Sequence, residues 1–241
     1  INIMGTIKTK KVLYDTVLSF SATMMLQVII QFVIYPFFAN LDGKIYDELI
    51  YLMTFVNIIG SMGSCISLER TKLSAEGDTY NGNFIRMISI FFLPVIPIAV
   101  GFLYVGKIHL STPEVICFIL LCLFSMLRNY CDVDFRMSLN YLKYFFYFMS
   151  IAAGNLLGLA IWGKSGNWIN VILLGEVFST IFVTIFGDTL NKKPFLTSAD
   201  ASRNMIVTLP VVLSGILNNV IFNMDRITLK LVCNDDTTLS V

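Results

Sequence analysis

Charged side chains recur at a four-residue interval inside one long apolar stretch of this sequence, at Arg128, Asp132 and Arg136. Residues four apart lie on one face of a helix, so the spacing predicts that these side chains can form a chain of ion pairs. Helical rise places Arg128 about 20 Å from the outer end of the stretch. A charge at that depth is costly unless it faces a partner or a wet cavity. We expect Arg128 to line a cavity, whereas a solvated helix end is an equal alternative for Asp132, Arg136 and Asp134, the last of which lies on another side of the helix.

A single carboxylate, Glu176, interrupts a second apolar stretch about 12 Å below its outer end. Its neighbours are leucine, valine and phenylalanine, so the carboxylate needs a partner or a proton. Two hypotheses stay open: Glu176 is a proton or cation site, or it is a structural hydrogen-bond partner for neighbouring helices. The same two roles, ion coupling or structure, are assigned to Asp132 and Asp225.

The last apolar stretch has one polar side. At 100° per residue, Asn219, Asn223, Arg226 and Lys230 fall within about 60° of one another, and the adjoining polar residues are Ser214, Asn218 and Asp225. Arg226 and Lys230 can form a cationic wall that faces an anionic substrate. The alternative is that both side chains reach towards the membrane surface as ordinary snorkelling residues.

The first apolar stretch carries a polar ladder in steps of four: Asp15, Ser19, Thr23, Gln27, Gln31 and Tyr35. Each step drifts by about 40° around a helix of 3.6 residues per turn, so the ladder winds across the helix. Glutamines in mid-membrane are costly if they face lipid. Gln27 and Gln31 are therefore expected either to line a wet cavity or to form hydrogen bonds between helices.

Bond-making chemistry finds no support in the sequence. The motifs GxGxxG, GxxxxGK[ST], HExxH and GxSxG do not occur, and His109 has no potential metal ligands at useful spacing. No catalytic residue, metal or cofactor is predicted, and a net charge of +1 implies no attraction to nucleic acid. The five cysteines, at 65, 117, 122, 131 and 233, are interpreted as small apolar residues.

The elements that must position these polar residues are seven apolar stretches. They run over Leu13–Phe38, Leu49–Leu68, Phe84–Val105, Val115–Phe135, Tyr144–Gly163, Trp168–Gly187 and Met205–Leu231. About 20 helical residues cross the hydrocarbon core of a bilayer, and each stretch is long enough. With 56% hydrophobic and 14% charged residues, the chain is predicted to be an all-α integral membrane protein.

Features within the stretches predict helix bends and helix contacts. Pro94 and Pro97 should kink the third helix and Pro210 the seventh, because proline removes an amide donor. Small residues should let helices approach closely in the second stretch, at Gly60, Gly63, Ser64 and Ser67, and in the fifth, at Gly154 and Gly158.

The distribution of basic residues predicts the orientation. With the N-terminus in the cytoplasm, inner segments carry eleven Lys and Arg residues (8, 10, 11, 70, 72, 86, 136, 143, 192, 193 and 203) and outer loops carry three (44, 107 and 164). Cytoplasmic loops carry an excess of Lys and Arg, so we expect a cytoplasmic N-terminus and a seventh helix that ends outside.

Several short motifs, in order along the chain, carry a resemblance to a known family. They are Phe135–Tyr141, Gly154–Gly158, Trp168, Leu174–Glu176, Lys193–Phe195 and Asn223–Leu229, with Asp225 and Arg226 the most informative pair. In this order and spacing the chain resembles the polysaccharide-transporter branch of the multidrug/oligosaccharidyl-lipid/polysaccharide exporter superfamily, the flippases of O-antigen and capsule repeat units.

The resemblance implies a two-lobe fold and a transport function. Residues 1–203 would form an N-terminal six-helix lobe, and residues 204–241 the first helix of a truncated second lobe. The protein would move lipid-linked (undecaprenyl-pyrophosphate-type) oligosaccharide across the bacterial cytoplasmic membrane by alternating access. Its expected partners are the lipid bilayer, the lipid-linked oligosaccharide and other polysaccharide-assembly proteins.

Individual residues take roles in this hypothesis. Arg128, Arg226 and Lys230 would bind the diphosphate, and Gln27, Gln31, Asn218 and Asn219 the sugars. Two alternatives stay open: a cation-coupled multidrug exporter of the same superfamily, and a membrane component of polysaccharide assembly without transport activity. A membrane enzyme is disfavoured, because no large outer loop or soluble domain is attached.

Overall fold

The chain folds into helices in the computed structural model, which describes residues 2–75, 81–187 and 201–232. No strand occurs in these ranges. The helices are α1 (Asn2–Ile29), η1 (Ile30–Ile34), α2 (Tyr35–Leu41), α3 (Gly43–Ala75), α4 (Asn81–Phe92), α5 (Val95–Val105), α6 (Thr112–Cys131), α7 (Val133–Met137), α8 (Tyr141–Trp162), η2 (Gly163–Ser165), α9 (Trp168–Phe186), α10 (Ala201–Phe222) and α11 (Met224–Val232).

Seven candidate spans are present in the described part of the chain, each long and apolar enough to cross a membrane. This confirms the predicted all-helical, multi-pass architecture. Some predicted features, namely Cys233, Lys192, Lys193 and the motif Lys193–Phe195, lie outside the described residues.

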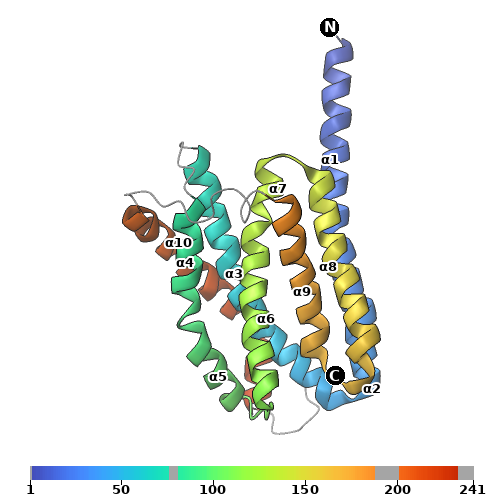
Figure 1. The fold of residues 1–241 in the computed structure, drawn as a ribbon, viewed down its shortest axis with the longest axis vertical. Coiled ribbons are helices and arrows are strands. Elements are labelled where there is room, and N and C mark those ends of the chain that lie inside the picture. The colour runs from blue at the N-terminus through green and yellow to red at the C-terminus, as the bar shows by residue number, and fades with distance from the viewer. Residues whose placement is uncertain (1, 76–80, 188–200, 233–241) are drawn as a thin grey trace.

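The spans pack side by side in an order that differs from their order in sequence. α1 packs on α8, α8 on α9, α9 on α6, α6 on α3, and α3 on α10. Figure 1 shows α4 and α5 on the α10 side of the bundle, with the N-terminal end of α1 projecting beyond its neighbours. α3 is the most buried span and α10 the least, so α3 forms the centre of the bundle.

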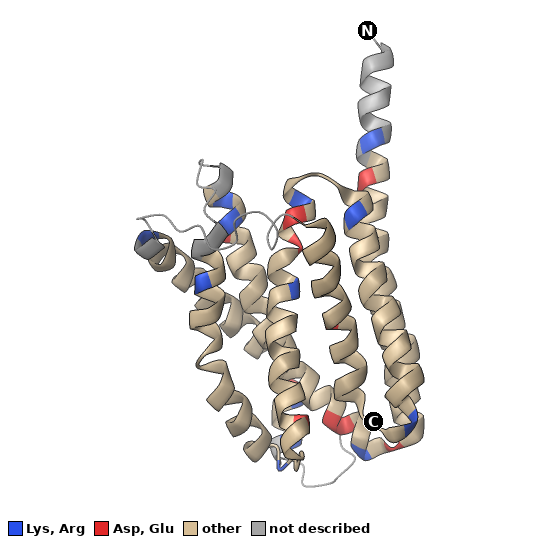
Figure 2. Ribbon diagram, in the orientation of Figure 1, with Lys and Arg blue, Asp and Glu red and all other residues tan. Residues whose placement is uncertain are grey.

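The outer surface of the bundle is apolar. Phe32, Tyr104, Ile206 and Phe222 belong to a large set of exposed apolar side chains spread over several spans. Charged residues instead collect near the two ends of the bundle, and few lie along its middle (Figure 2). A water-soluble protein rarely exposes apolar surface on this scale, whereas a lipid-facing surface requires it.

The first span changes helix type halfway along. Between α1 and α2 the backbone forms one π-helical turn, Ile30–Ile34, closed by a bond from the Tyr35 amide to the Ile30 carbonyl. Pro36 follows directly and has no amide hydrogen to donate. Single π turns inside α-helices are frequent at functional sites, and this turn contains Gln31.

Two further spans are interrupted. The third breaks at Leu93–Pro94, between α4 and α5, where proline was predicted to bend it. The seventh runs unbroken through Pro210 and breaks instead at Asn223, between α10 and α11. The single helix predicted over Met205–Leu231 is therefore two helices.

Glycines bring neighbouring helices together, as predicted for the second and fifth stretches. A methyl group added to Gly158 would lie 2.7 Å from the Val171 carbonyl oxygen, and one on Gly154 would lie 2.8 Å from the Gly175 Cα. These glycines hold α8 against α9, the most extensive helix contact in the fold. Gly60 likewise faces Ser125 across the α3–α6 contact.

Local capping fixes where the inner helices begin. The Ser111 amide donates to the Glu114 carboxylate at 2.8 Å at the start of α6. Asn140 and Asn167 accept from backbone amides three residues on, at the starts of α8 and α9. Side-chain oxygens at these positions satisfy amides that have no partner within the helix, so α6, α8 and α9, three of the helices around the polar interior, have defined starts.

Candidate functional site

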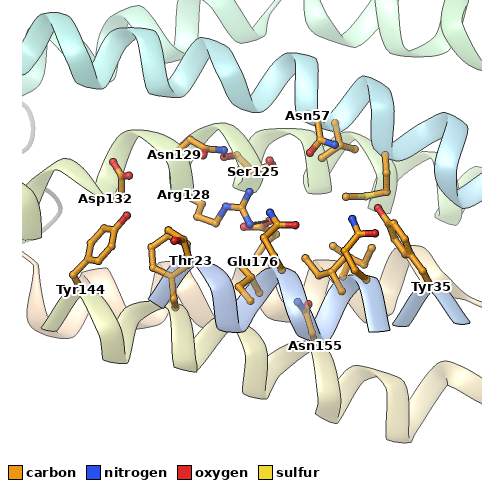
Figure 3. A pocket seen from close by; sticks show the side chains of 18 of the residues that line it. Thr23, Tyr35, Asn57, Ser125, Arg128, Asn129, Asp132, Tyr144, Asn155 and Glu176 are labelled. Carbon is orange, nitrogen blue, oxygen red and sulfur yellow. Dashed lines mark hydrogen bonds and ion pairs between the residues drawn. The ribbon is translucent and has the colours of Figure 1, made fainter. Parts of the chain in front are cut away.

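A polar cavity of about 310 Å³ lies inside the bundle. Its walls come from α1 and the π turn, α3, α6, α8, α9 and α11. Figure 3 shows Arg128 and Glu176 near its middle, Tyr35 towards one end, and Asp132 and Tyr144 towards the other. Six of the ten residues predicted as binding or ion-coupling residues line it: Gln27, Gln31, Arg128, Asp132, Glu176 and Arg226.

An ion pair spans the cavity between α6 and α9. Arg128 Nη1 lies 3.0 Å from Glu176 Oε1, and the two side chains are 19% and 3% exposed. The Tyr147 hydroxyl donates to the Arg128 carbonyl at 3.1 Å and fixes this turn of α6 against α8. Glu176 is thus paired, as a lone carboxylate in an apolar span requires.

The predicted chain of ion pairs along α6 forms only in its second half. Arg136 Nη2 lies 2.6 Å from Asp132 Oδ1 and donates to the Ser67 hydroxyl at 3.2 Å. Arg128 does not continue this chain, because Glu176 on the neighbouring helix holds its guanidinium. The expectation failed at Arg128 because it considered partners only on the same helix.

A second buried pair lies near Asp132. Arg70 of α3 meets Asp134 of α7 at 3.2 Å and stacks over the Tyr130 ring. Both pairs join α3 to the α6–α7 segment at the end of the bundle that holds α7. Asp134 thus contacts α3 through Arg70, and Asp132 contacts the same helix through Ser67.

The π turn keeps the polar ladder of the first span on one face. Gln27, Gln31 and Tyr35 all line the cavity, although steps of four drift around an ordinary α-helix. A π turn holds more residues than an α turn, so it turns the chain less per residue and offsets the drift. Both glutamines line the cavity, which was one of the two alternatives for them.

The ladder residues nearest the N-terminus of α1 line a second hollow. Asp15 and Ser19 lie there with Lys11 and Tyr141, between α1 and the start of α8. Thr23 lines both this hollow and the central cavity. The polar side chains of α1 thus form a continuous track from the end of the bundle into its middle.

Most of the polar side predicted for the seventh span lies away from the cavity. Arg226 reaches it, but Lys230, Asn218, Asn219 and Asp225 are not among its lining residues. The Asn219 amide donates to the Gly215 carbonyl of its own helix at 3.1 Å. The prediction assumed one continuous helix, and the break at Asn223 separates Asn218 and Asn219 in α10 from Arg226 in α11; Lys230 lies one turn beyond Arg226 on the same helix.

Three asparagines of the cavity were missed by the sequence analysis as binding residues: Asn57, Asn129 and Asn155. Asn155 lies between the packing glycines of α8 and is 1% exposed. A lone amide in an apolar span was the available signal, because such a group needs a polar neighbour. Asn129 Nδ2 donates to the Ser125 carbonyl at 2.8 Å, along its own helix.

Two residues that line the cavity have a buried acceptor atom without a hydrogen bond: Glu176 Oε2 and Asn155 Oδ1, the latter lying against Gly175 of α9. Buried oxygens in proteins almost always accept a hydrogen bond from the protein, water or a ligand. Both atoms thus have capacity for an added donor.

The formal charges that line the cavity cancel. Arg128 and Arg226 oppose Asp132 and Glu176. Within the described ranges no acidic side chain forms an ion pair with the exposed Arg226. In this part of the chain, Arg226 is therefore the cavity arginine without an acidic partner, whereas Arg128 is paired with Glu176. The same ranges contain no group of three His, Cys, Asp or Glu side chains that could hold a metal ion.

Comparison of the chain with protein-family models, with curated proteins and with solved structures finds no significant match. The arguments for function therefore rest on the geometry and chemistry of the cavity.

Proposed function

We propose that this protein is a transporter that moves a lipid-linked, diphosphate-bearing oligosaccharide across a bacterial cytoplasmic membrane by alternating access, for surface polysaccharide synthesis. The observation that supports the proposal most directly is the cavity itself. It places two guanidiniums and several amides inside a bundle whose outer surface is apolar. A permeant with a polar head and a hydrocarbon tail matches that combination.

The cavity offers donors suited to both parts of such a head group. Guanidiniums bind phosphate oxygens through paired, charge-assisted hydrogen bonds, and Arg226 is exposed to the cavity. The amides of Gln27, Gln31 and Asn57 supply both donors and acceptors for sugar hydroxyls. The polyprenyl tail would stay in the bilayer, against the apolar exterior.

The orientation is part of the proposal. We place the N-terminus in the cytoplasm because basic residues are concentrated in the segments on that side, eleven against three. The cavity would then exchange between the leaflets, with the polar track along α1 leading towards the cytoplasmic side. Lys11 and Asp15 lie at the start of that track.

The test is translocation of a lipid-linked oligosaccharide in proteoliposomes that contain the full chain. Arg226→Ala and Arg128→Ala should each slow translocation by about 10- to 100-fold, because a hydrogen bond to a charged group contributes about 1.5–3 kcal/mol. Arg86→Ala is the matched control, since Arg86 is an exposed arginine on α4 outside the cavity. If all three variants transport normally, the cavity does not bind the head group. If the wild type moves nothing, the protein acts in polysaccharide assembly without transport.

A second candidate, a cation-coupled multidrug exporter, is favoured by one observation. Glu176 Oε2 and Asn155 Oδ1 are buried acceptors without a hydrogen-bond donor, and such oxygens suit a proton, a small cation or an amine. Export of cationic dyes from cells that express the full chain discriminates the two functions. Loss of dye export in Glu176→Gln, with no translocation of lipid-linked oligosaccharide by the wild type, would favour the exporter.

A further inference from the structure

We infer that Glu176 is a built-in competitor for the anion site: it occupies the Arg128 guanidinium until an anionic ligand displaces it. The inference rests on the proposed function, in which the ligand is the diphosphate of the lipid-linked sugar. It concerns how the ligand gains access to the Arg128 guanidinium, which Glu176 already binds.

The first argument is that Arg128 is not free to bind an anion in this structure. Glu176 Oε1 lies 3.0 Å from Arg128 Nη1, the distance of a formed charge-assisted hydrogen bond. A phosphate that binds the guanidinium through two parallel hydrogen bonds across its Nη groups needs Nη1 as well. Glu176 and the ligand therefore compete for one donor group.

The second argument is that the carboxylate is only partly held. Glu176 Oε2 accepts no hydrogen bond although the side chain is 3% exposed. A carboxylate built as a fixed structural partner has donors for both oxygens. Glu176 instead binds through one oxygen, so a ligand with several oxygens can replace it with a net gain of contacts.

The third argument comes from the neighbouring charges. Among the charged side chains that line the cavity, Asp132 is held by Arg136 and the exposed Arg226 has no acidic partner in the described ranges. A diphosphate can thus dock on Arg226 first and reach Arg128 only by displacing Glu176. When the ligand leaves, Glu176 returns to Arg128, which favours release and keeps the site from holding its ligand too tightly.

Binding of inorganic pyrophosphate to the full chain in detergent micelles, measured by calorimetry, tests the inference. Glu176→Gln should bind pyrophosphate about tenfold more tightly than the wild type, because the removed contact is worth at least the 1.4 kcal/mol that a tenfold change represents. Glu176→Asp keeps the charge but shortens its reach, so its affinity should fall between the two. The double variant Arg128→Gln/Glu176→Gln should lose the gain.

A matched control removes a different charge from the same cavity. Asp132→Asn also deletes one carboxylate, but Asp132 is paired with Arg136 and not with Arg128. Its effect on pyrophosphate affinity should be well below that of Glu176→Gln. An equal gain in both variants overturns the inference, because net charge alone would then explain it. Unchanged or weaker affinity in folded Glu176→Gln and Glu176→Asp overturns it too, as does absence of pyrophosphate binding in every variant.

Translocation by the wild type, measured in parallel, separates this inference from the proposed function. If the pyrophosphate ranking holds but lipid-linked oligosaccharide is not moved, Glu176 is a competitor and the proposed substrate is wrong. If the oligosaccharide is moved and the ranking fails, only the role of Glu176 is wrong.

Discussion

Removing either partner of the Arg128–Glu176 pair should destabilise the fold, and the two losses should be unequal. Arg128→Gln leaves the Glu176 carboxylate, 3% exposed, without a counter-charge. Loss of one partner of a buried ion pair costs about 3–5 kcal/mol, and we expect a value in that range. Glu176→Gln leaves the guanidinium, which is 19% exposed to a polar cavity, so the expected cost is smaller, about 1–3 kcal/mol.

Arg136→Gln is the matched control for burial. Its ion pair with Asp132 is shorter, at 2.6 Å against 3.0 Å, but the arginine is 48% exposed. The Asp132 carboxylate left behind is 17% exposed, against 3% for Glu176, and keeps the Ser67 hydroxyl within reach. This variant should therefore lose less than Arg128→Gln, about 1–2 kcal/mol. The comparison separates the effect of burial from that of distance.

Equilibrium unfolding of the purified chain in mixed micelles, followed by fluorescence of its two tryptophans, measures all three losses. The double variant Arg128→Gln/Glu176→Gln should recover most of the loss seen in Arg128→Gln, because no charge is then left unpaired. Equal losses in Arg128→Gln and Arg136→Gln would refute the reasoning, since burial would then not determine the cost.

Two further predictions concern packing and orientation. In the same assay, Gly158→Leu should lower the free energy of unfolding by about 3 kcal/mol because its side chain would clash with the backbone of α9, whereas Gly101→Ala, with open space around the added methyl, should be neutral or stabilising. Equal effects would show that the α8–α9 contact is loose. Ser165 lies in a proposed outer loop and Ser138 in a proposed inner loop. In a variant without native cysteines, a membrane-impermeant maleimide applied to whole cells should label Ser165→Cys and leave Ser138→Cys unlabelled until the cells are opened. The reverse pattern would invert the proposed topology.

The spans could be predicted from the sequence because they depend on length and hydropathy, which need no knowledge of neighbours. The sixth stretch, predicted over Trp168–Gly187, is α9 over Trp168–Phe186. The break at Pro94 was also predictable, since proline acts on its own helix. The π turn at Ile30–Ile34 and the break at Asn223 were not, because neither a π turn nor an asparagine break has a strong local signature.

The cavity residues could be predicted where a polar side chain at that depth in the membrane would have a large free-energy cost in contact with lipid. Arg128, Gln27 and Gln31 were identified because lipid cannot accommodate them, and each lines the cavity. Asn218 and Lys230 were predicted to join them, and neither is a lining residue: Asn218 lies in α10, before the break at Asn223, whereas Lys230 lies one turn beyond Arg226 on α11. The helix break at Asn223 changed which side chains of the seventh span face inward.

The partner of Arg128 depends on the relative positions of two helices, which periodicity does not report. Both α6 and α9 run in the same direction, and α6 extends further than α9 at the end of the bundle where both begin (Figure 1). Helical rise from their first residues puts Arg128 about 24 Å along α6 and Glu176 about 12 Å along α9. The offset between the two helix starts, together with the long stem of arginine, brings the guanidinium to the carboxylate. Depth counted from each helix start does not predict this partner, because it leaves out how far neighbouring helices are shifted along each other. The sequence therefore indicated Asp132, on the same helix as Arg128, rather than Glu176 on the next.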